Sequence, residues 1–165
     1  MRNGVPLRST VYLSPVLSKP TFYAACLAYV HLRLDAARAG MAAAQESSNS
    51  ETKSSAGDKY ETGRAMAQQE RDRHAAQLHE AQQQLAELQK INPELTTDTV
   101  RLGALVATTL GVFYVSIGAG QLRTADGVAF VAVSASAPLL QALAGRRAGE
   151  QIAFNNKQIQ LLEVS

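Results

Sequence analysis

The chain has few of the residues that build disulfide-rich domains or large aromatic cores. Among its 165 residues there is one cysteine, Cys26, and no tryptophan, and aromatic residues make up only 5%. One thiol cannot form an internal disulfide, so a secreted disulfide framework is excluded and a reducing cytoplasm fits. Hydrophobic residues make up 46% of the chain, which is enough for modest cores of aliphatic side chains.

Net charge is also small, and it is unevenly distributed. Sixteen basic and 14 acidic residues give +2, which offers no general argument for nucleic-acid binding. No acidic residue precedes Asp35. Residues 1–20 show neither a helical period nor a long apolar run, so a secretory signal is not expected. We interpret them as a disordered tail or a start assigned too early, with an organellar transit peptide as the alternative.

Two segments carry apolar residues at the 3- and 4-residue spacing of a coiled coil. They predict helices at about 21–47 and from 57 or 58 to 91, with Pro93 as the stop. The linking residues are rich in Ser, Asn and Gly, and Ser55 with Asp58 resembles a capping box. A short link between matched helices predicts an antiparallel hairpin and a monomer. The predicted seam residues are Leu27, Val30, Leu34, Ala37 and Met41, facing Leu78, Ala81, Leu85 and Leu88.

The composition changes at residues 92–94, which we interpret as a domain boundary between a hairpin at 21–92 and a small β-rich domain at 97–165. Runs of β-branched and aromatic residues predict its strands. Pro138 predicts the start of a short helix that ends before Gly145, and Asn155-Asn156 predicts a tight turn. The predicted strands are 104–109, 112–117, 128–133, 151–154 and 158–162, with a turn at 125–127 and the helix at 138–144.

A membrane-anchored coiled-coil protein is the alternative from another class. Residues 102–122 and 127–145 lack charge and are long enough to span a bilayer. Both contain scattered Gly, Ser and Thr, and Pro138 interrupts the second. The mean hydropathy of −0.10 is that of a soluble protein, so we favour the β domain.

The C-terminal third carries the pattern Val-Ser, Pro, an apolar pair, a short helix, Gly and basic residues, at 133–150. With Gly103–Val106 as an opening strand and a hairpin before it, the chain resembles the Gre transcript-cleavage factors over about residues 21–165. The resemblance implies an α+β fold, in which an antiparallel coiled-coil hairpin precedes a small FKBP-like antiparallel β domain with one short helix. It implies binding to bacterial RNA polymerase in the cytoplasm, with the hairpin tip in the secondary channel.

In that family, acidic tip residues help to hold a second Mg²⁺ at the polymerase active site, and carboxylate oxygens suit that ion. Tyr60 matches the family's tip tyrosine, which places Lys53 and Ala56 where the two acids stand. Glu51 and Asp58 are the nearby acids and our candidate catalytic residues. The chain would stimulate the polymerase's own hydrolysis, without a cofactor of its own, or would act as a non-cleaving channel regulator. The predicted partner-binding residues are Lys53, Lys59, Tyr60, Pro138, Arg146 and Arg147.

Each of these residues also has a simpler structural interpretation. The tip acids resemble solvated or capping acids, lysines are usually solvated, and Arg146-Arg147 can complement a helix C-terminus. His74 and His79 are five residues apart and point about 140° from each other on a helix, so no histidine metal site is expected. Cys26 is expected to be a buried seam residue.

Overall fold

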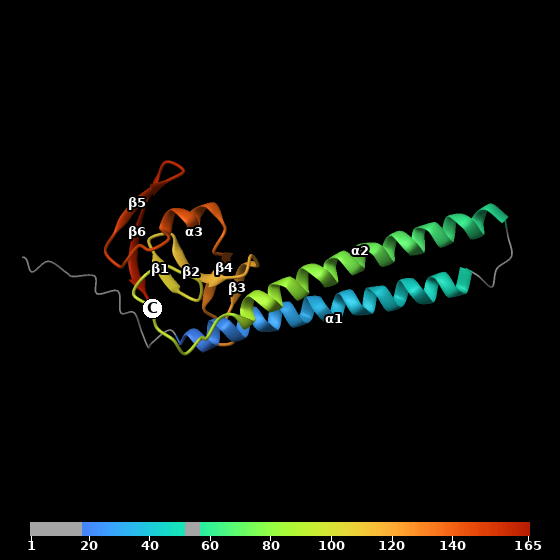
Figure 1. Ribbon diagram of the computed structural model, residues 1–165, viewed down its shortest axis with the longest axis horizontal. Helices are drawn as coiled ribbons and strands as arrows, with labels where there is room; N and C mark the ends of the chain where they lie inside the picture. The colour runs from blue at the N-terminus through green and yellow to red at the C-terminus, as the bar shows by residue number, and fades with distance from the viewer. Residues whose placement is uncertain (1–17, 52–56) are drawn as a thin grey trace, which may run out of the picture.

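The computed structural model describes residues 18–51 and 57–165, and the side chains of 51 and 58–60 lie outside the description. Two long helices, α1 (Lys19–Glu51) and α2 (Gly57–Gln89), precede a six-stranded sheet and one short helix, so the fold is α+β. The helices run side by side as an antiparallel hairpin whose distal end extends far from the sheet (Figure 1). The helical hairpin predicted from the sequence is therefore confirmed.

Helix α1 is longer than predicted at both ends. It begins at Lys19, with Pro20 in its first turn, where the missing N–H of proline costs no hydrogen bond. It continues through the serine-rich stretch to Glu51, so the expected break at 47 is wrong. Ser and Asn are weak helix formers and not breakers, and an existing helix extends through them at small cost. Residues 1–17, the subject of the tail prediction, lie outside the described residues.

The hairpin seam follows the predicted spacing with one shift at its base. Val30, Leu34 and Ala37 of α1 are buried, as are Ala81 and Leu88 of α2. The predicted Leu27 is only half-buried, because Cys26 and Phe22 take the buried positions toward the start of α1. The shift arises where the helix leaves its partner helix and packs on the sheet.

The sheet has the strand order β3-β4-β2-β1-β6-β5. Its strands are β1 (Leu105–Thr108), β2 (Gly111–Ser116), β3 (Gly120–Arg123), β4 (Ala129–Ser134), β5 (Gln151–Phe154) and β6 (Lys157–Val164). Helix α3 (Pro138–Leu143) connects β4 to β5. Four of the five pairings are antiparallel, but β2 and β4 are parallel, with Phe113 beside Val131.

The resemblance implied a wholly antiparallel β domain, and this prediction is wrong because the sheet is mixed. The sequence prediction lacked β3, which lies at the sheet edge and has one half-buried apolar residue, Leu122. Without β3, the chain would be expected to turn once between β2 and β4, which would make these strands antiparallel. Because β3 lies between them in the sequence, the chain turns twice and β4 runs parallel to β2. The specific likeness to FKBP stays a prediction.

Local turn chemistry is as predicted at three places. Asn155 and Asn156 have φ of 48° and 62°, and they join β5 to β6 as a two-residue hairpin turn. Pro138 starts α3, and Gly145 follows its C-terminus at φ 74°, a conformation that favours glycine. Gly127, at φ 89°, completes the turn before β4. In each case the residues that fix the turn are adjacent in sequence.

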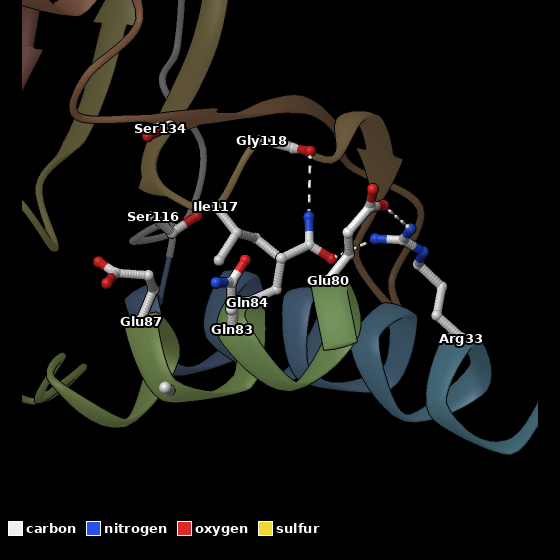
Figure 2. Close-up of a pocket in the computed structure, with 10 residues that line it drawn as sticks. Arg33, Glu80, Gln83, Gln84, Glu87, Ser116, Ile117, Gly118 and Ser134 are labelled. Carbon is white, nitrogen blue, oxygen red and sulfur yellow. Dashed lines mark hydrogen bonds and ion pairs between the residues drawn. The ribbon is translucent and has the colours of Figure 1, made fainter. Parts of the chain in front are cut away.

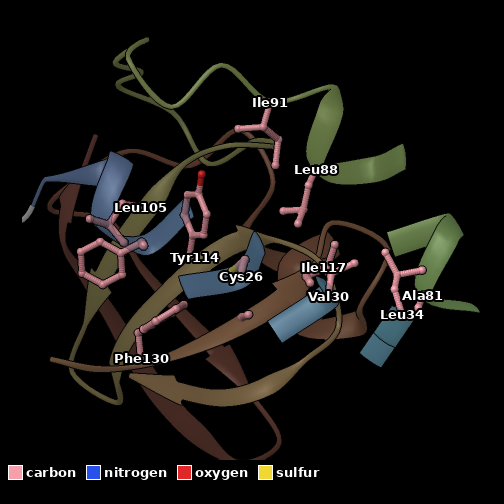
Figure 3. Packing of buried hydrophobic residues seen from close by; sticks show 12 residues of the cluster. Cys26, Val30, Leu34, Ala81, Leu88, Ile91, Leu105, Tyr114, Ile117 and Phe130 are labelled. Atoms are coloured by element: carbon pink, nitrogen blue, oxygen red, sulfur yellow. The ribbon is translucent and has the colours of Figure 1, made fainter. Parts of the chain in front are cut away.

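Two hydrophobic cores lie on opposite faces of the sheet. Adjacent residues of β1 alternate between them: Leu105 packs toward the hairpin and Val106 toward α3. Figure 3 shows the hairpin core, where side chains of α1 and α2 meet those of the sheet. Its buried helical members are Phe22, Cys26, Val30, Leu34, Ala81 and Leu88, and they lie beside Tyr114, Ile117 and Phe130 of the sheet domain.

One hydrophobic core contains residues from both of the predicted modules, 21–92 and 97–165. The base of the hairpin and the sheet bury one another's apolar surface, although the helices and strands are separate in sequence. The division into these two modules stays a prediction. Among the residues that the structure describes, no helix combines the length and apolar composition needed to cross a membrane.

Candidate functional site

The distal half of the hairpin is the part of the molecule most clearly set apart from the sheet (Figure 1). From Arg33 to Glu51 the helix α1 extends about 27 Å, at about 1.5 Å per residue. Beyond Leu34 the buried seam residues are small, with Ala37, Ala44 and Ala67 buried, and Met66 is 63% exposed. The rod therefore has a narrow apolar seam and a polar surface, which suits entry into a confined polar space.

Polar contacts between the helices replace apolar ones toward the distal end. Arg71 donates a hydrogen bond to Gln45 Oε1 across the hairpin, at 3.0 Å. His74, half-buried, lies against Gly40 and its Nδ1 is 3.0 Å from Gln77 Oε1. Both Arg71 and His74 stand near seam positions where the sequence predicted a poorer seam. Fewer large apolar side chains are buried here than at the base, as expected.

The backbone brings the two predicted tip acids to the same end of the hairpin. Glu51 is the last residue of α1, and Asp58 is in the first turn of α2. Lys59 and Tyr60 share that first turn, while Lys53 lies outside the described residues, as does the predicted capping box. The roles of these side chains stay predictions, because the structure does not describe them.

The other predicted partner-binding residues lie in the sheet domain, at the other end of the molecule. They are Pro138, Arg146 and Arg147. Arg146 Nη1 is 3.4 Å from Glu150 Oε1, and Arg147 Nη1 is 3.4 Å from Asp98 Oδ2. The N–H of Arg147 also donates to Glu150, which with the Arg146 guanidinium lowers the pKa of that carboxyl. The arginines thus brace the loop after α3, and their side chains remain exposed.

A crevice of about 510 Å³ opens where the base of α2 passes the ends of β2 and β4 (Figure 2). Arg33 reaches across from α1 and donates to Gln84 Oε1 and, at 3.2 Å, to Glu80 Oε2. Gln84 Nε2 in turn donates to the Gly118 carbonyl at 3.2 Å. The other lining residues are Gln83, Ala86, Glu87, Ser116, Ile117 and Ser134. Sequence reasoning missed this site, because its residues are scattered and each resembles an ordinary surface residue.

The interior between hairpin and sheet contains several polar groups. Cys26 Sγ is 3.6 Å from Ser116 Oγ, and Lys19 Nζ donates to the Gly103 carbonyl at 3.2 Å. Burial, with the nearby charge of Arg101, lowers the pKa of Lys19. The Tyr114 hydroxyl is buried and makes no hydrogen bond within the described chain. Cys26 is fully buried, so its predicted structural role is confirmed.

The buried thiol predicts a loss of stability in alkaline solution. Burial raises the pKa of Cys26 from about 9 to about 11, against a smaller opposing effect of the Ser116 hydrogen bond. Between these values the unfolded chain releases a proton that the folded chain retains, so stability falls as pH rises. The loss should approach about 2–3 kcal/mol by pH 11, since each unit is worth about 1.4 kcal/mol. Urea unfolding from pH 8 to 11 measures it.

Cys26→Ala is the matched control for this loss. The variant is less stable at pH 8, because it leaves a small cavity, but its stability should fall less steeply than that of the wild type. Burial also raises the pKa of Tyr114, which adds to the alkaline loss, while Lys19 opposes it. Both groups remain in the variant, but the charge of Cys26 also contributes to the raised pKa of Tyr114, so the difference in slope reports Cys26 together with this coupling. Equal slopes would contradict the assignment.

The described residues contain no group of three or more His, Cys, Asp and Glu side chains that could hold a metal ion.

No protein-family model matches the chain, and no curated protein matches it either. Among solved structures, the chain is similar to the transcription factor Gfh1, with 19% sequence identity over 85% of this chain and 93% of that one. The TM-score is 0.35, which is too low for this likeness to support an argument about function.

Proposed function

We propose that this protein is a Gre-like regulator of transcription elongation that binds RNA polymerase and inserts its hairpin tip into the secondary channel. One observation carries the proposal: a 33-residue helix pairs with another of 33 residues, and their distal half extends free of a small β domain. Such a rod reaches a buried site that a compact domain cannot enter. The sequence pattern at 133–150 supports the same assignment.

In this proposal the sheet domain docks on the outside of the polymerase and the hairpin provides the reach. Pro138, Arg146 and Arg147 are exposed at the end of the molecule away from the tip. The exposed arginines suit an acidic polymerase surface. Lys53, Lys59 and Tyr60 would contact the channel or the transcript. The protein would contact RNA and DNA only within the elongation complex, in the cytoplasm, as a monomer.

The proposed chemistry belongs to the polymerase. Glu51 and Asp58, at the ends of α1 and α2, would help to hold Mg²⁺ in the polymerase active site and to position a water for hydrolysis of backtracked RNA. The chain would supply carboxylate oxygens and would not be an enzyme by itself. Lys53 and Ala56 stand where the Gre family has its tip acids, and this favours a second candidate, a channel regulator that does not stimulate cleavage.

Transcript cleavage by purified, backtracked RNA polymerase in Mg²⁺ buffer tests the proposal. We expect shortened RNA that depends on the full-length protein and that falls at least about tenfold in rate with Glu51→Ala/Asp58→Ala, since each metal-supporting oxygen contributes to the transition state. Glu163→Ala, which removes an exposed acid of β6 far from the tip, is the matched control and should keep the wild-type rate.

The same experiment separates the two candidates. Absence of cleavage, combined with competition against a known channel-binding factor, would establish the non-cleaving regulator. Absence of both cleavage and competition would refute polymerase binding at this channel. Equal losses with Glu163→Ala and with the tip variant would show that the tip acids have no special role.

A further inference from the structure

Gln84 uses both ends of its amide to join three parts of the fold. Its oxygen accepts a hydrogen bond from Arg33 of α1, and its nitrogen donates to the carbonyl of Gly118, in the turn between β2 and β3. Figure 2 shows the amide between the guanidinium and the turn. Because Gln84 itself belongs to α2, one side chain connects both helices of the hairpin to the sheet.

Neighbouring groups hold this connection in one geometry. The second guanidinium nitrogen of Arg33 donates to Glu80 at 3.2 Å, and the guanidinium carbon lies 5.7 Å from the centre of the Tyr29 ring. A planar guanidinium with two acceptors and an aromatic face has few alternative orientations. Arg33 therefore fixes the amide of Gln84 with its nitrogen toward Gly118.

The bond to Gly118 lies farther out along the hairpin than the other polar contacts described above between helices and sheet. Lys19 and Cys26 contact the sheet domain near the start of α1, whereas Gln84 lies at the level of Arg33. From Gln84 the helix α2 continues for about 40 Å to Gly57, at about 1.5 Å per residue. A tilt of about 10° at this level moves the distal end by about 7 Å over that length.

Apolar packing alone does not define such an angle well. The core contacts of Val30, Ala81 and Leu88 resist separation of hairpin and sheet, but hydrophobic attraction has no direction and tolerates small rotations. A hydrogen bond to a fixed carbonyl is directional. The crevice beside Gln84 leaves space for the hairpin to tilt toward the sheet when that bond is absent.

We propose that Gln84 is a positioning residue, which together with Arg33 and the Gly118 carbonyl fixes the direction of the hairpin relative to the sheet and so the place of its tip. The role in transcription rests on the proposed function, but the geometric role does not. Its removal leaves the hairpin attached through the core and widens the range of angles that the hairpin adopts.

The test is a distance distribution between two spin labels in the full-length protein. Ala65→Cys on the distal part of α2 and Lys157→Cys on β6 are exposed sites for the labels, in a Cys26→Ala background. Gln84→Ala should broaden the distribution by about twofold or more. The neighbouring Gln83→Ala, which removes an exposed amide from the same crevice, is the matched control and should leave the distribution unchanged.

A second variant separates the bond to the sheet from the pairing of the helices. Gln84→Glu keeps an acceptor for Arg33 but has no N–H for the Gly118 carbonyl, so it should broaden the distribution as Gln84→Ala does, without a fall in melting temperature. An unchanged distribution in both Gln84 variants, or equal broadening in Gln83→Ala, would overturn the proposal.

Polymerase assays then test the link to function. Gln84→Ala should raise the concentration for half-maximal cleavage or competition severalfold, and Gln83→Ala should not. A broadened distribution with normal activity would refute the functional part of the positioning role. A wild-type protein that neither stimulates cleavage nor competes would refute the proposed function, while the spin-label result would still decide the geometric role.

Discussion

Replacing Phe22 with alanine is expected to lower the free energy of unfolding by about 3–5 kcal/mol, the usual cost of deleting a buried aromatic ring. Phe22 is 1% exposed at the base of α1. Its ring meets that of Phe130 edge to face, with centroids 4.9 Å apart, and it also lies 6.3 Å from the ring of Tyr114. The deletion removes the main aromatic contact between hairpin and sheet.

Chemical denaturation followed by circular dichroism measures this loss. Leu32→Ala is the matched control, because Leu32 lies on the same helix but is 72% exposed, and its removal should change stability by less than about 0.5 kcal/mol. Similar losses in the two variants would show that the aromatic contact is not what anchors the hairpin. Phe22→Leu should recover much of the lost stability, since it restores most of the volume.

We expect Gly40→Ala to destabilise the protein when His74 is present and to stabilise it when His74 is replaced by alanine. In the middle of a helix this change normally stabilises by about 1 kcal/mol, because alanine is the better helix former. Here an added Cβ would lie 2.6 Å from Cγ of His74. That atom moves only if His74 changes its χ1 rotamer, so either the ring leaves its place against α1 and loses its hydrogen bond to Gln77, or the helices separate, at a cost of about 1–3 kcal/mol.

His74→Ala removes the obstruction and supplies the test. In that background Gly40→Ala should stabilise the protein by about 1 kcal/mol, whereas in the wild type it should destabilise it. Urea midpoints of the wild type, the two single variants and the double variant give the coupling energy between the sites. Additive changes would contradict the close contact of the helices at this level. The contact sets how narrow the hairpin is at this level.

Much of the fold was predictable because it depends on short-range patterns. The spacing of Val30, Leu34 and Ala37 predicted a helix and its buried face, and Pro138 with Gly145 predicted the ends of α3. Asn155-Asn156 predicted a two-residue turn. All of these depend on residues within one or two turns of each other, where backbone geometry and solvent exposure leave few alternatives.

The candidate site was predictable only in part. The sequence placed Glu51 within the link and Asp58 at the start of the second helix, and in the structure the end of α1 and the start of α2 both lie at the distal end of the hairpin. It gave no indication of Gln84, because a half-buried glutamine on a glutamine-rich helix has no periodic signal. The role of that amide comes from Arg33 and Gly118, which are 51 and 34 residues away in the chain.

The sequence by itself determined the two long helices, their antiparallel pairing and most of the strands, because each follows from local periodicity and turn chemistry. Only the tertiary structure decided that β3 forms the sheet edge, that β2 and β4 are parallel, and that the hairpin base packs on one face of the sheet. These features depend on contacts between distant segments, and a strand's partner and direction leave no mark on its own few residues. The direction of the hairpin is of this kind, because it depends on where a carbonyl of one segment meets an amide of another.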